Sequence, residues 1–303
     1  MEWTRLMCPD RIRPVNRNSS STDKRTEFEK DYQRIISSAS FRRLQDKTQV
    51  FPLDKSDFIR TRLTHSLVDA STEKVLGAEA LLRWKSDEYG MVPPDTFIPF
   101  LENDPLFPEL GAWIIKTAIK DTRKILELVP EFIVNVNLSY SQLERTDFTD
   151  SVLHMVKLGG IAPEHLCLEI TERCRLLDME LLRNVIVKLR AGGVKVALDD
   201  FGTGYSSVGL VKNLPFDTIK IDRSFVREIE LDEKEKRLLN NFTDMAGIFG
   251  ADVCVEGIET SGMRDIIRDY GIHSFQGYYY SKPVPLDELL DQIKTGSGYY
   301  SKQ

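Results

Sequence analysis

The chain has 303 residues, of which 41% are hydrophobic and 29% are charged. This composition is typical of a globular protein with one large domain and a small additional segment. There is no apolar run near the ~18 residues of a membrane span and no apolar signal core near the amino terminus, so we expect no membrane contact and a cytoplasmic location. Residues 71–303 hold 27 basic and 37 acidic side chains, a net charge of −10, which argues against a nucleic acid polymer as partner.

The first part of the chain gives few structural signals. Residues 1–23 are polar and predict a loop or tail. Residues 23–46 predict a helix, because Phe28, Tyr32 and Ile35 recur at helical spacing. The residues that follow, up to about residue 67, show no regular hydrophobic periodicity.

From Val68 onward the pattern changes to alternating strands and helices. Seven apolar segments predict strands, at residues 74–83, 132–139, 165–172, 194–198, 218–222, 252–258 and 274–280. The helices predicted between and after them are residues 109–129, 141–158, 178–191, 206–213, 224–249, 262–270 and 286–293. Such alternation is typical of a parallel sheet covered by helices. Cys167 and Cys254 lie in two of the strands and should be buried, small apolar residues.

A closed (β/α)₈ barrel needs eight strands, and the first candidate for the eighth is residues 62–68. An open, doubly wound sheet is the alternative, but no Gly-x-Gly-x-x-Gly follows an early strand. We therefore expect an α/β fold with a TIM-like barrel at residues 68–295. A small, mostly helical segment at residues 1–67, which can supply a barrel strand, precedes it, and a tail at residues 296–303 follows.

Polar side chains recur where the apolar strands end. They are Asn137, Glu169, Glu172, Asp199, Asp200, Lys220, Asp222, Glu256 and Glu259, and Glu79 lies inside the strand at 74–83. Any one of these residues can be a satisfied core group. Five strands that each bring a polar group to one rim are hard to explain by packing, and barrel enzymes have their active sites at that rim.

The residue types at this rim favour a metal site. The set is almost entirely oxygen donors, which prefer Mg²⁺ or Mn²⁺. The adjacent carboxylates of Asp199 and Asp200 repel each other and need a cation. Several neighbouring carboxylates suit a two-metal site that hydrolyses phosphate esters. Lys220 could orient a water or stabilise developing charge, and the alternative is a strand-end lysine that reaches solvent.

Seven ordered motifs carry a family resemblance over about residues 68–293. They are GAEALLRW, VNVNLSYSQL, LEITE, ALDDFGTGYSS, IKID, VEGIET and FQGYYYSKPV. Together they resemble the EAL family of cyclic-di-GMP phosphodiesterases. The resemblance implies a (β/α)₈ barrel with one reversed strand, a homodimer, and hydrolysis of cyclic di-GMP to linear pGpG with two Mg²⁺ or Mn²⁺ ions.

The same resemblance implies a role for each matching residue. The implied metal ligands are Glu79, Asn137, Glu169, Asp199, Asp200 and Glu256, with Asp199 bridging the two ions. Lys220 would assist the nucleophilic water, and Glu172 would anchor the loop at residues 201–207. The implied substrate contacts are Leu82, Arg83, Glu259 and Gln276, with Arg83 on a phosphate and Gln276 on a guanine.

The early part of the chain carries a second resemblance. FEKDYQRIISSASFRRLQDKTQVFPL followed by RTRLTHSL resembles the amino-terminal part of the deoxyguanosine triphosphate triphosphohydrolases of the HD superfamily. In that family His65 would be the first metal ligand. The remaining ligands do not follow downstream, and one histidine cannot hold a catalytic metal. We therefore expect no triphosphohydrolase activity, and His65 to be a surface or packing residue.

The EAL resemblance is incomplete at its start. The family normally begins with a strand that contains Tyr-Gln-Pro-Ile, whose glutamine helps hold the substrate, and here the triphosphohydrolase-like segment takes its place. A missing strand would expose sheet edges to pairing between chains. The alternative to an active phosphodiesterase is therefore a weak or inactive domain that binds cyclic di-GMP or a partner protein.

Overall fold

The computed structural model describes residues 60–296, except for 87–89, 95–97, 99–101, 103–106, 173, 175–177 and 204–206. The helix expected at 23–46 and most of the triphosphohydrolase-like segment lie outside the described residues. Within the described part, no helix combines the length and apolar character needed to cross a membrane.

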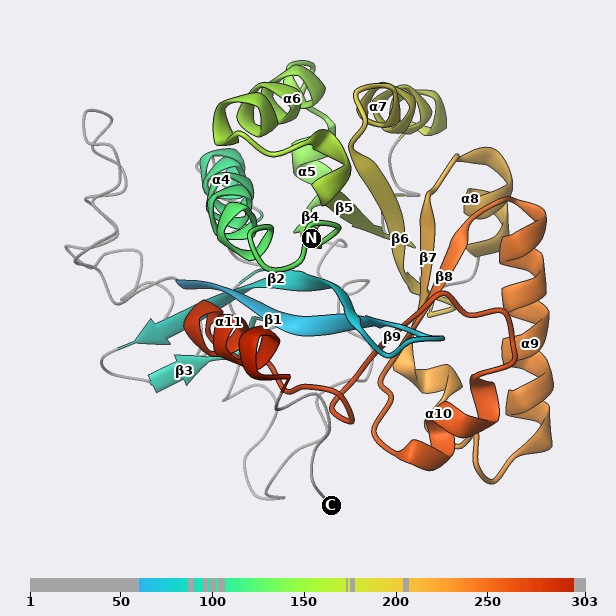
Figure 1. Ribbon diagram of the computed structural model, residues 1–303. Coiled ribbons are helices and arrows are strands. Elements are labelled where there is room, and N and C mark those ends of the chain that lie inside the picture. The colour runs from blue at the N-terminus through green and yellow to red at the C-terminus, as the bar shows by residue number, and fades with distance from the viewer. Residues whose placement is uncertain are drawn as a thin grey trace, which may run out of the picture. The chain divides into compact units, whose positions relative to one another are not determined.

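Eight strands form a closed barrel (Figure 1). The ring follows the order β1-β9-β8-β7-β6-β5-β4-β2, and β1 also pairs with β2 to close it. β3 is added to the outer end of β2 as a short hairpin. The strands are β1 (Arg60–Asp69), β2 (Val75–Ser86), β3 (Gly90–Val92), β4 (Ile133–Leu138), β5 (Leu166–Thr171), β6 (Lys195–Phe201), β7 (Thr218–Ile221), β8 (Asp252–Glu256) and β9 (Ser274–Gln276).

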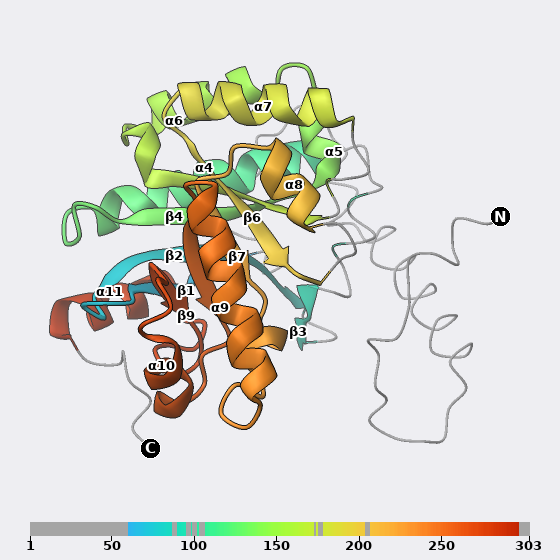
Figure 2. The ribbon, with the colours of Figure 1, turned by 90° about the vertical axis from the view of Figure 1, so that its right-hand side faces the viewer.

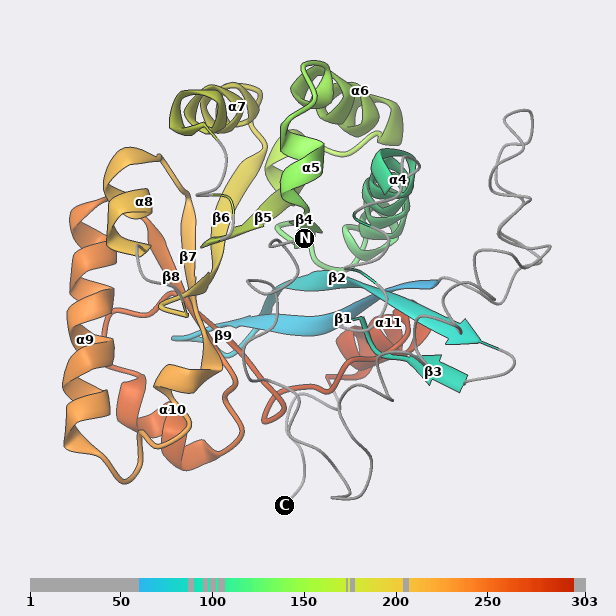
Figure 3. The same cartoon turned by 180° about the vertical axis from the view of Figure 1, so that it is seen from behind.

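Helices surround the barrel on its outer side, as Figures 1 and 3 show from opposite directions. In Figure 2 the long helix α9 crosses in front of the strands, with α8 beside it. The helices are α4 (Phe107–Ile125), α5 (Tyr140–Leu143), α6 (Phe148–Gly159), α7 (Met179–Ala191), α8 (Ser207–Asn213), α9 (Glu233–Ile248), α10 (Ser261–Ile267) and α11 (Leu286–Thr295). The expected barrel is confirmed, and the open sheet is excluded.

β1 is the reversed strand of the barrel and covers the expected residues 62–68. It runs antiparallel to both neighbours, β2 and β9, whereas the other barrel strands are parallel to one another. Its sequence, RTRLTHSLVD, contains no Tyr-Gln-Pro-Ile, so other side chains occupy the closing strand. The expected domain boundary between residues 67 and 68 falls within this strand.

The turn between β1 and β2 is fixed at two places. Inside the turn, the Asp69 carboxylate accepts hydrogen bonds from the backbone N–H groups of Ser71 and Thr72, at 3.1 and 2.6 Å. Outside it, Arg264 of α10 pairs with Glu73 at 2.9 Å and donates to the Tyr279 hydroxyl at 3.0 Å. These contacts connect the turn to α10 and to the segment that follows β9.

Burial on both faces of the barrel sheet explains why the strands have continuous apolar runs in the sequence. β5 has one face inside the barrel and the other against helices, so five of its six residues are buried. Helix α7 contributes the apolar side of its amphipathic pattern, with Leu182, Ile186 and Leu189 all at 0% exposure. Cys167 and Cys254 are buried and free, as expected.

Several predicted elements differ from the observed ones in their bounds, among them two helices and one strand. The helix expected at 141–158 is two helices, α5 and α6, which Glu144 and Asp147 separate. The helix expected at 224–249 is a 3₁₀ turn followed by α9, because Asp232 caps α9 by accepting from the Lys234 N–H. The strand expected at 274–280 ends at Gln276. The next residue, Gly277, lies directly against the backbone of Ile258 in the loop after β8.

This close approach makes Gly277 a sensitive position. A Cβ there would lie 2.1 Å from the Ile258 carbonyl oxygen, so we expect Gly277→Ala to destabilise the fold by about 1–3 kcal/mol. The control is Gly247→Ala in α9, where a Cβ meets nothing within 4 Å and a gain of about 0.5–1 kcal/mol is expected. Denaturant unfolding measures both, and equal stability of the two variants would contradict the close approach.

Candidate active site

A buried lysine lies at the centre of the polar rim. The Lys220 side chain, on β7, is 1% exposed, which excludes the solvent-reaching alternative. Its Nζ lies 2.7 Å from Glu169 Oε1, 2.7 Å from Glu256 Oε1, 3.1 Å from Asp199 Oδ1 and 3.9 Å from Glu79 Oε2. Four strands thus bring their carboxylates to one ammonium group.

The register of the sheet produces this convergence. Asn137 of β4 lies opposite Glu169 of β5, and Thr171 lies opposite Asp199 of β6. In the neighbouring pair of β8 and β9, Glu256 lies opposite Gln276. Because the strands of β4 to β9 are parallel, their carboxyl ends meet at the same rim.

Glu79 is held by neighbours from both sides. The Asn137 side-chain amide donates to Glu79 Oε1 at 2.5 Å, and the Gln276 amide donates to Glu79 Oε2 at 3.0 Å. Glu79 therefore joins β2 to β4 and β9 through its two oxygens. The amide of Gln276 is fixed by the same contact, at the edge of the carboxylate group.

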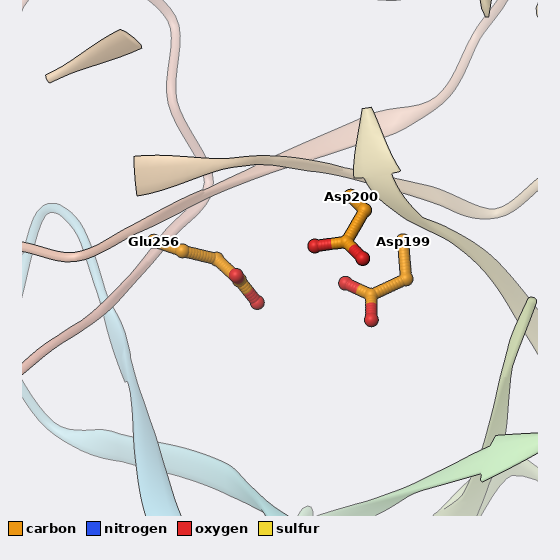
Figure 4. Close-up of side chains that lie close together, drawn as sticks. All are labelled: Asp199, Asp200 and Glu256. Carbon is orange, nitrogen blue, oxygen red and sulfur yellow. The ribbon is translucent and has the colours of Figure 1, made fainter. Parts of the chain in front are cut away.

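A second group of carboxylates lies beside the lysine. Asp199, Asp200 and Glu256 each offer an oxygen, and these oxygens lie within 4.8 Å of one another. Figure 4 shows the three side chains pointing toward one another. This spacing is suitable for a bound divalent cation of the hard type, which prefers oxygen ligands.

Asp199 and Asp200 share this region because β6 is irregular there. Consecutive residues of a regular strand point to opposite faces of the sheet. In β6 the register to β7 shifts between Leu198 and Phe201, and Asp200 has a φ of 55°, in the left-handed region that is uncommon for a non-glycine residue. The bulge turns both carboxylates toward the same group.

Burial and charge move the pKa values of these groups apart. Burial raises the pKa of Glu169 well above its usual range and that of Glu256 to about 8, with Lys220 opposing both shifts. Burial alone would lower the pKa of Lys220, but the surrounding carboxylates, Asp199 first, raise it well above normal. The lysine therefore stays cationic, and Glu169 and Glu256 hold protons more tightly than free glutamates do.

These crowded, buried carboxyl groups fit a bound metal, which would take the place of their protons. Glu169 Oε2 is buried and has no hydrogen-bond partner among the described residues, and Asp200 adds a further carboxylate to the group around Lys220. Buried carboxylates without enough cations are unfavourable. The donor set of carboxylate and amide oxygens suits Mg²⁺ or Mn²⁺, as expected from the sequence.

The remaining expected residues lie around this group. Glu172 is buried and accepts from the Gly202 N–H at 2.7 Å, which connects it to the start of the loop after β6. Leu82 is buried, and its carbonyl accepts from the Arg83 guanidinium at 2.9 Å. Glu259 is exposed after β8. Asp222 directly follows β7 and also caps a 3₁₀ turn, with its carboxylate accepting from the Ser224 N–H at 3.0 Å.

His65 is the site residue that sequence reasoning missed. It was expected at the surface or in packing, but it lies directly opposite Glu79 in the antiparallel register of β1 and β2. Burial lowers the pKa of His65, with Glu79 opposing and Lys220 adding to the shift. A prediction of strand pairing between β1 and β2 would have shown that these two side chains share a face.

Comparisons with known proteins agree with this geometry. The model of the EAL domain family matches residues 65–283. In Pseudomonas aeruginosa, the bifunctional diguanylate cyclase/cyclic di-GMP phosphodiesterase MucR is 31% identical over 220 residues, which are 72% of this chain and 32% of MucR. The cyclic di-GMP phosphodiesterase NbdA of the same organism is 34% identical over 217 residues, which are 71% of this chain and 28% of NbdA.

Solved structures show the same fold. The Pseudomonas aeruginosa MucR phosphodiesterase in complex with c-di-GMP has a TM-score of 0.73 at 28% identity and covers 87% of this chain and 99% of that chain. The chain spans about a third of the length of the curated relatives it matches. None of the relatives named here is a triphosphohydrolase, so that resemblance remains a sequence observation. The family match over residues 65–283 shows that the chain belongs to the EAL domain family.

Proposed function

We propose that the chain hydrolyses one phosphodiester bond of cyclic di-GMP to give linear pGpG, with two Mg²⁺ or Mn²⁺ ions. The observation that carries this proposal is the ring of carboxylates around the buried Lys220. The printed activities of MucR and NbdA support it. By this activity the chain would lower the level of a second messenger.

Six residues would hold the ions. They are Glu79, Asn137, Glu169, Asp199, Asp200 and Glu256. Asp199 would bridge the two ions, since it contacts Lys220 and also belongs to the Asp200–Glu256 group. When bound, two divalent ions lower the pKa of a bound water and stabilise the attacking and leaving oxygens.

Lys220 would act as a cation and not as a base. Its raised pKa keeps the ammonium protonated at neutral pH, so it has no free electron pair to accept a proton. Its Nζ already contacts Glu169 and Glu256 at 2.7 Å. From that position it can orient a water molecule or stabilise negative charge on a phosphate oxygen.

The substrate would lie across the rim between β2, β8 and β9. Arg83 would contact a phosphate and Gln276 a guanine, with Leu82 and Glu259 at the borders of the site. The role of Gln276 is supported by the contact with Glu79 that orients its amide. Glu172 would fix the loop at 201–207 through Gly202. A homodimer and a cytoplasmic location complete the proposal.

The first test is product analysis with Mn²⁺. Cyclic di-GMP should be converted to pGpG, and Glu79→Ala should lower the rate by about 100-fold or more because an ion ligand is lost. Glu180→Ala, an exposed acid in the first turn of α7, is the matched control with full activity. Binding of cyclic di-GMP by the parent chain without any pGpG would instead show a binding module.

The second test concerns Lys220. Lys220→Met should lower kcat by about 10²–10³-fold through lost charge stabilisation. Without metal it should also destabilise the fold by about 3–5 kcal/mol, because the buried carboxylates lose their counter-ion. Steady-state kinetics and thermal unfolding with and without Mn²⁺ measure both effects, with exposed Lys234→Met as control. Loss of Mn²⁺ binding in the variant would refute the assigned role.

The third test uses pH in the metal-free protein. Burial raises the folded pKa of Glu256 to about 8 and raises that of Glu169, against about 4.3 in an unfolded chain. The folded state therefore holds protons that the unfolded state releases, and its stability falls as pH rises through this range. The lowered pKa of Glu79 acts only at more acidic pH.

Thermal unfolding in EDTA at pH 5.5 and 8.5 should therefore show a lower midpoint at the higher pH. Added Mn²⁺ should reverse the loss, since the ions replace the protons on these carboxylates. A midpoint that rises with pH in EDTA would show that Glu169 and Glu256 do not share this buried, charge-rich environment.

A further inference from the structure

A short 3₁₀ turn lies behind two carboxylates of the candidate cation site. The turn, Arg223–Phe225, comes shortly after β7. On one side it contacts Gly202, which lies two residues after Asp200 of β6. On the other side it contacts Gly257, which directly follows Glu256 of β8. A single turn thus contacts the two chain segments that present these carboxylates, both of which belong to the group in Figure 4.

Both contacts are as close as a backbone and a side chain allow. A Cβ at Gly202 would overlap the ring of Phe225, and a Cβ at Gly257 would overlap the Cβ of Arg223. Both glycines have a positive φ, 94° and 75°, which residues with a side chain rarely adopt. Neither segment can therefore move toward the turn, and the turn limits the position of both.

Two further phenylalanines hold the ring of Phe225. The ring packs edge-to-face on Phe242 of α9, with centroids 5.2 Å apart at an interplanar angle of 83°. Phe242 packs in the same way on Phe201, at 5.2 Å and 89°, and edge-to-face packing is a favoured arrangement of aromatic rings. Phe201 directly follows Asp200, so the row of three rings starts and ends beside the bulge of β6.

The bulge needs such support because its backbone is strained. Asp200 has a φ of 55°, and strained residues persist only where their surroundings fix them. The backbone N–H and the hydroxyl of Thr203 both donate to the Asp200 carbonyl, at 3.2 and 2.9 Å. Glu172 accepts from the Gly202 N–H at 2.7 Å. The ring of Phe225 is a second contact at Gly202, made by packing and not by a hydrogen bond.

We infer that Phe225 is a positioning residue of the metal site: its ring holds Gly202 and thereby keeps the Asp199–Asp200 bulge at the distance from Glu256 that a divalent cation requires. This inference rests on the proposed function and deepens it. The side chain of Phe225 has no polar atom, so it acts only through the carboxylates. Partners that orient metal ligands typically change metal affinity about 10- to 100-fold when they are lost.

The experiment is Mn²⁺ binding, measured by titration calorimetry and by EPR of free Mn²⁺, with cyclic di-GMP hydrolysis alongside. Phe225→Ala should raise the apparent Kd for Mn²⁺ about 10-fold or more and leave kcat at saturating Mn²⁺ within about threefold. Phe225→Leu keeps part of the packing and should show a smaller effect. Gly202→Ala should also weaken binding, because its Cβ meets the ring.

Two comparisons separate positioning from general stability. In the double variant Gly202→Ala/Phe225→Ala the fold-change in Kd should be smaller than the product of the two single changes, because the ring that the new Cβ would meet is gone. The matched control is Phe132→Leu, a fully buried phenylalanine directly before β4 and so at the opposite end of the barrel from the rim. It should lower thermal stability and leave the Kd for Mn²⁺ unchanged.

Three results would overturn the inference. One is an unchanged Kd for Mn²⁺ in Phe225→Ala, and another is an equal loss of affinity in Phe132→Leu. The third is a double variant whose fold-change equals the product of the single ones. If the parent chain binds Mn²⁺ but makes no pGpG, the proposed function fails, while weaker Mn²⁺ binding in Phe225→Ala keeps the inference. Absence of Mn²⁺ binding by the parent chain removes both.

Discussion

One buried ammonium group among four carboxylates is the constraint on which the rest of the site depends. Lys220 is almost fully buried, and acids from β2, β5, β6 and β8 surround its ammonium group. A lysine alone in such a place would lose its proton, and the acids alone would repel one another. Together they are stable enough to fold, and divalent cations can replace the protons that Glu169 and Glu256 retain. The same electrostatics thus serves both folding and the chemistry proposed for the rim.

The sequence was sufficient for the barrel and for most of the rim. Apolar runs such as the one at 194–198 locate parallel strands, and polar residues that follow such runs must meet where the strands end. That logic predicts from the sequence alone that Glu169, Asp199 and Lys220 lie near one another. The expectation for residues 62–68 as the closing strand was also met by β1.

The parts that the sequence could not provide depend on irregular backbone and on long-range pairing. Nothing local to Asp199 and Asp200 shows that a bulge with a left-handed residue turns both toward one group. The capping role of Asp222, which accepts from the Ser224 N–H directly after β7, was likewise not expected. His65 could be placed only once the register between β1 and β2 was known, because a shift of one residue would turn it to the other face.

The fixed turn between β1 and β2 has a consequence for how this family can vary. The turn is held by Asp69 within itself and by the Arg264–Glu73 pair from outside, so the position of β1 depends little on which side chains it presents to the barrel interior. The first strand is in this sense an exchangeable part. Its sequence can therefore vary while the carboxylate rim stays intact, and each variation offers new side chains beside Glu79 on which selection for ligand preference can act.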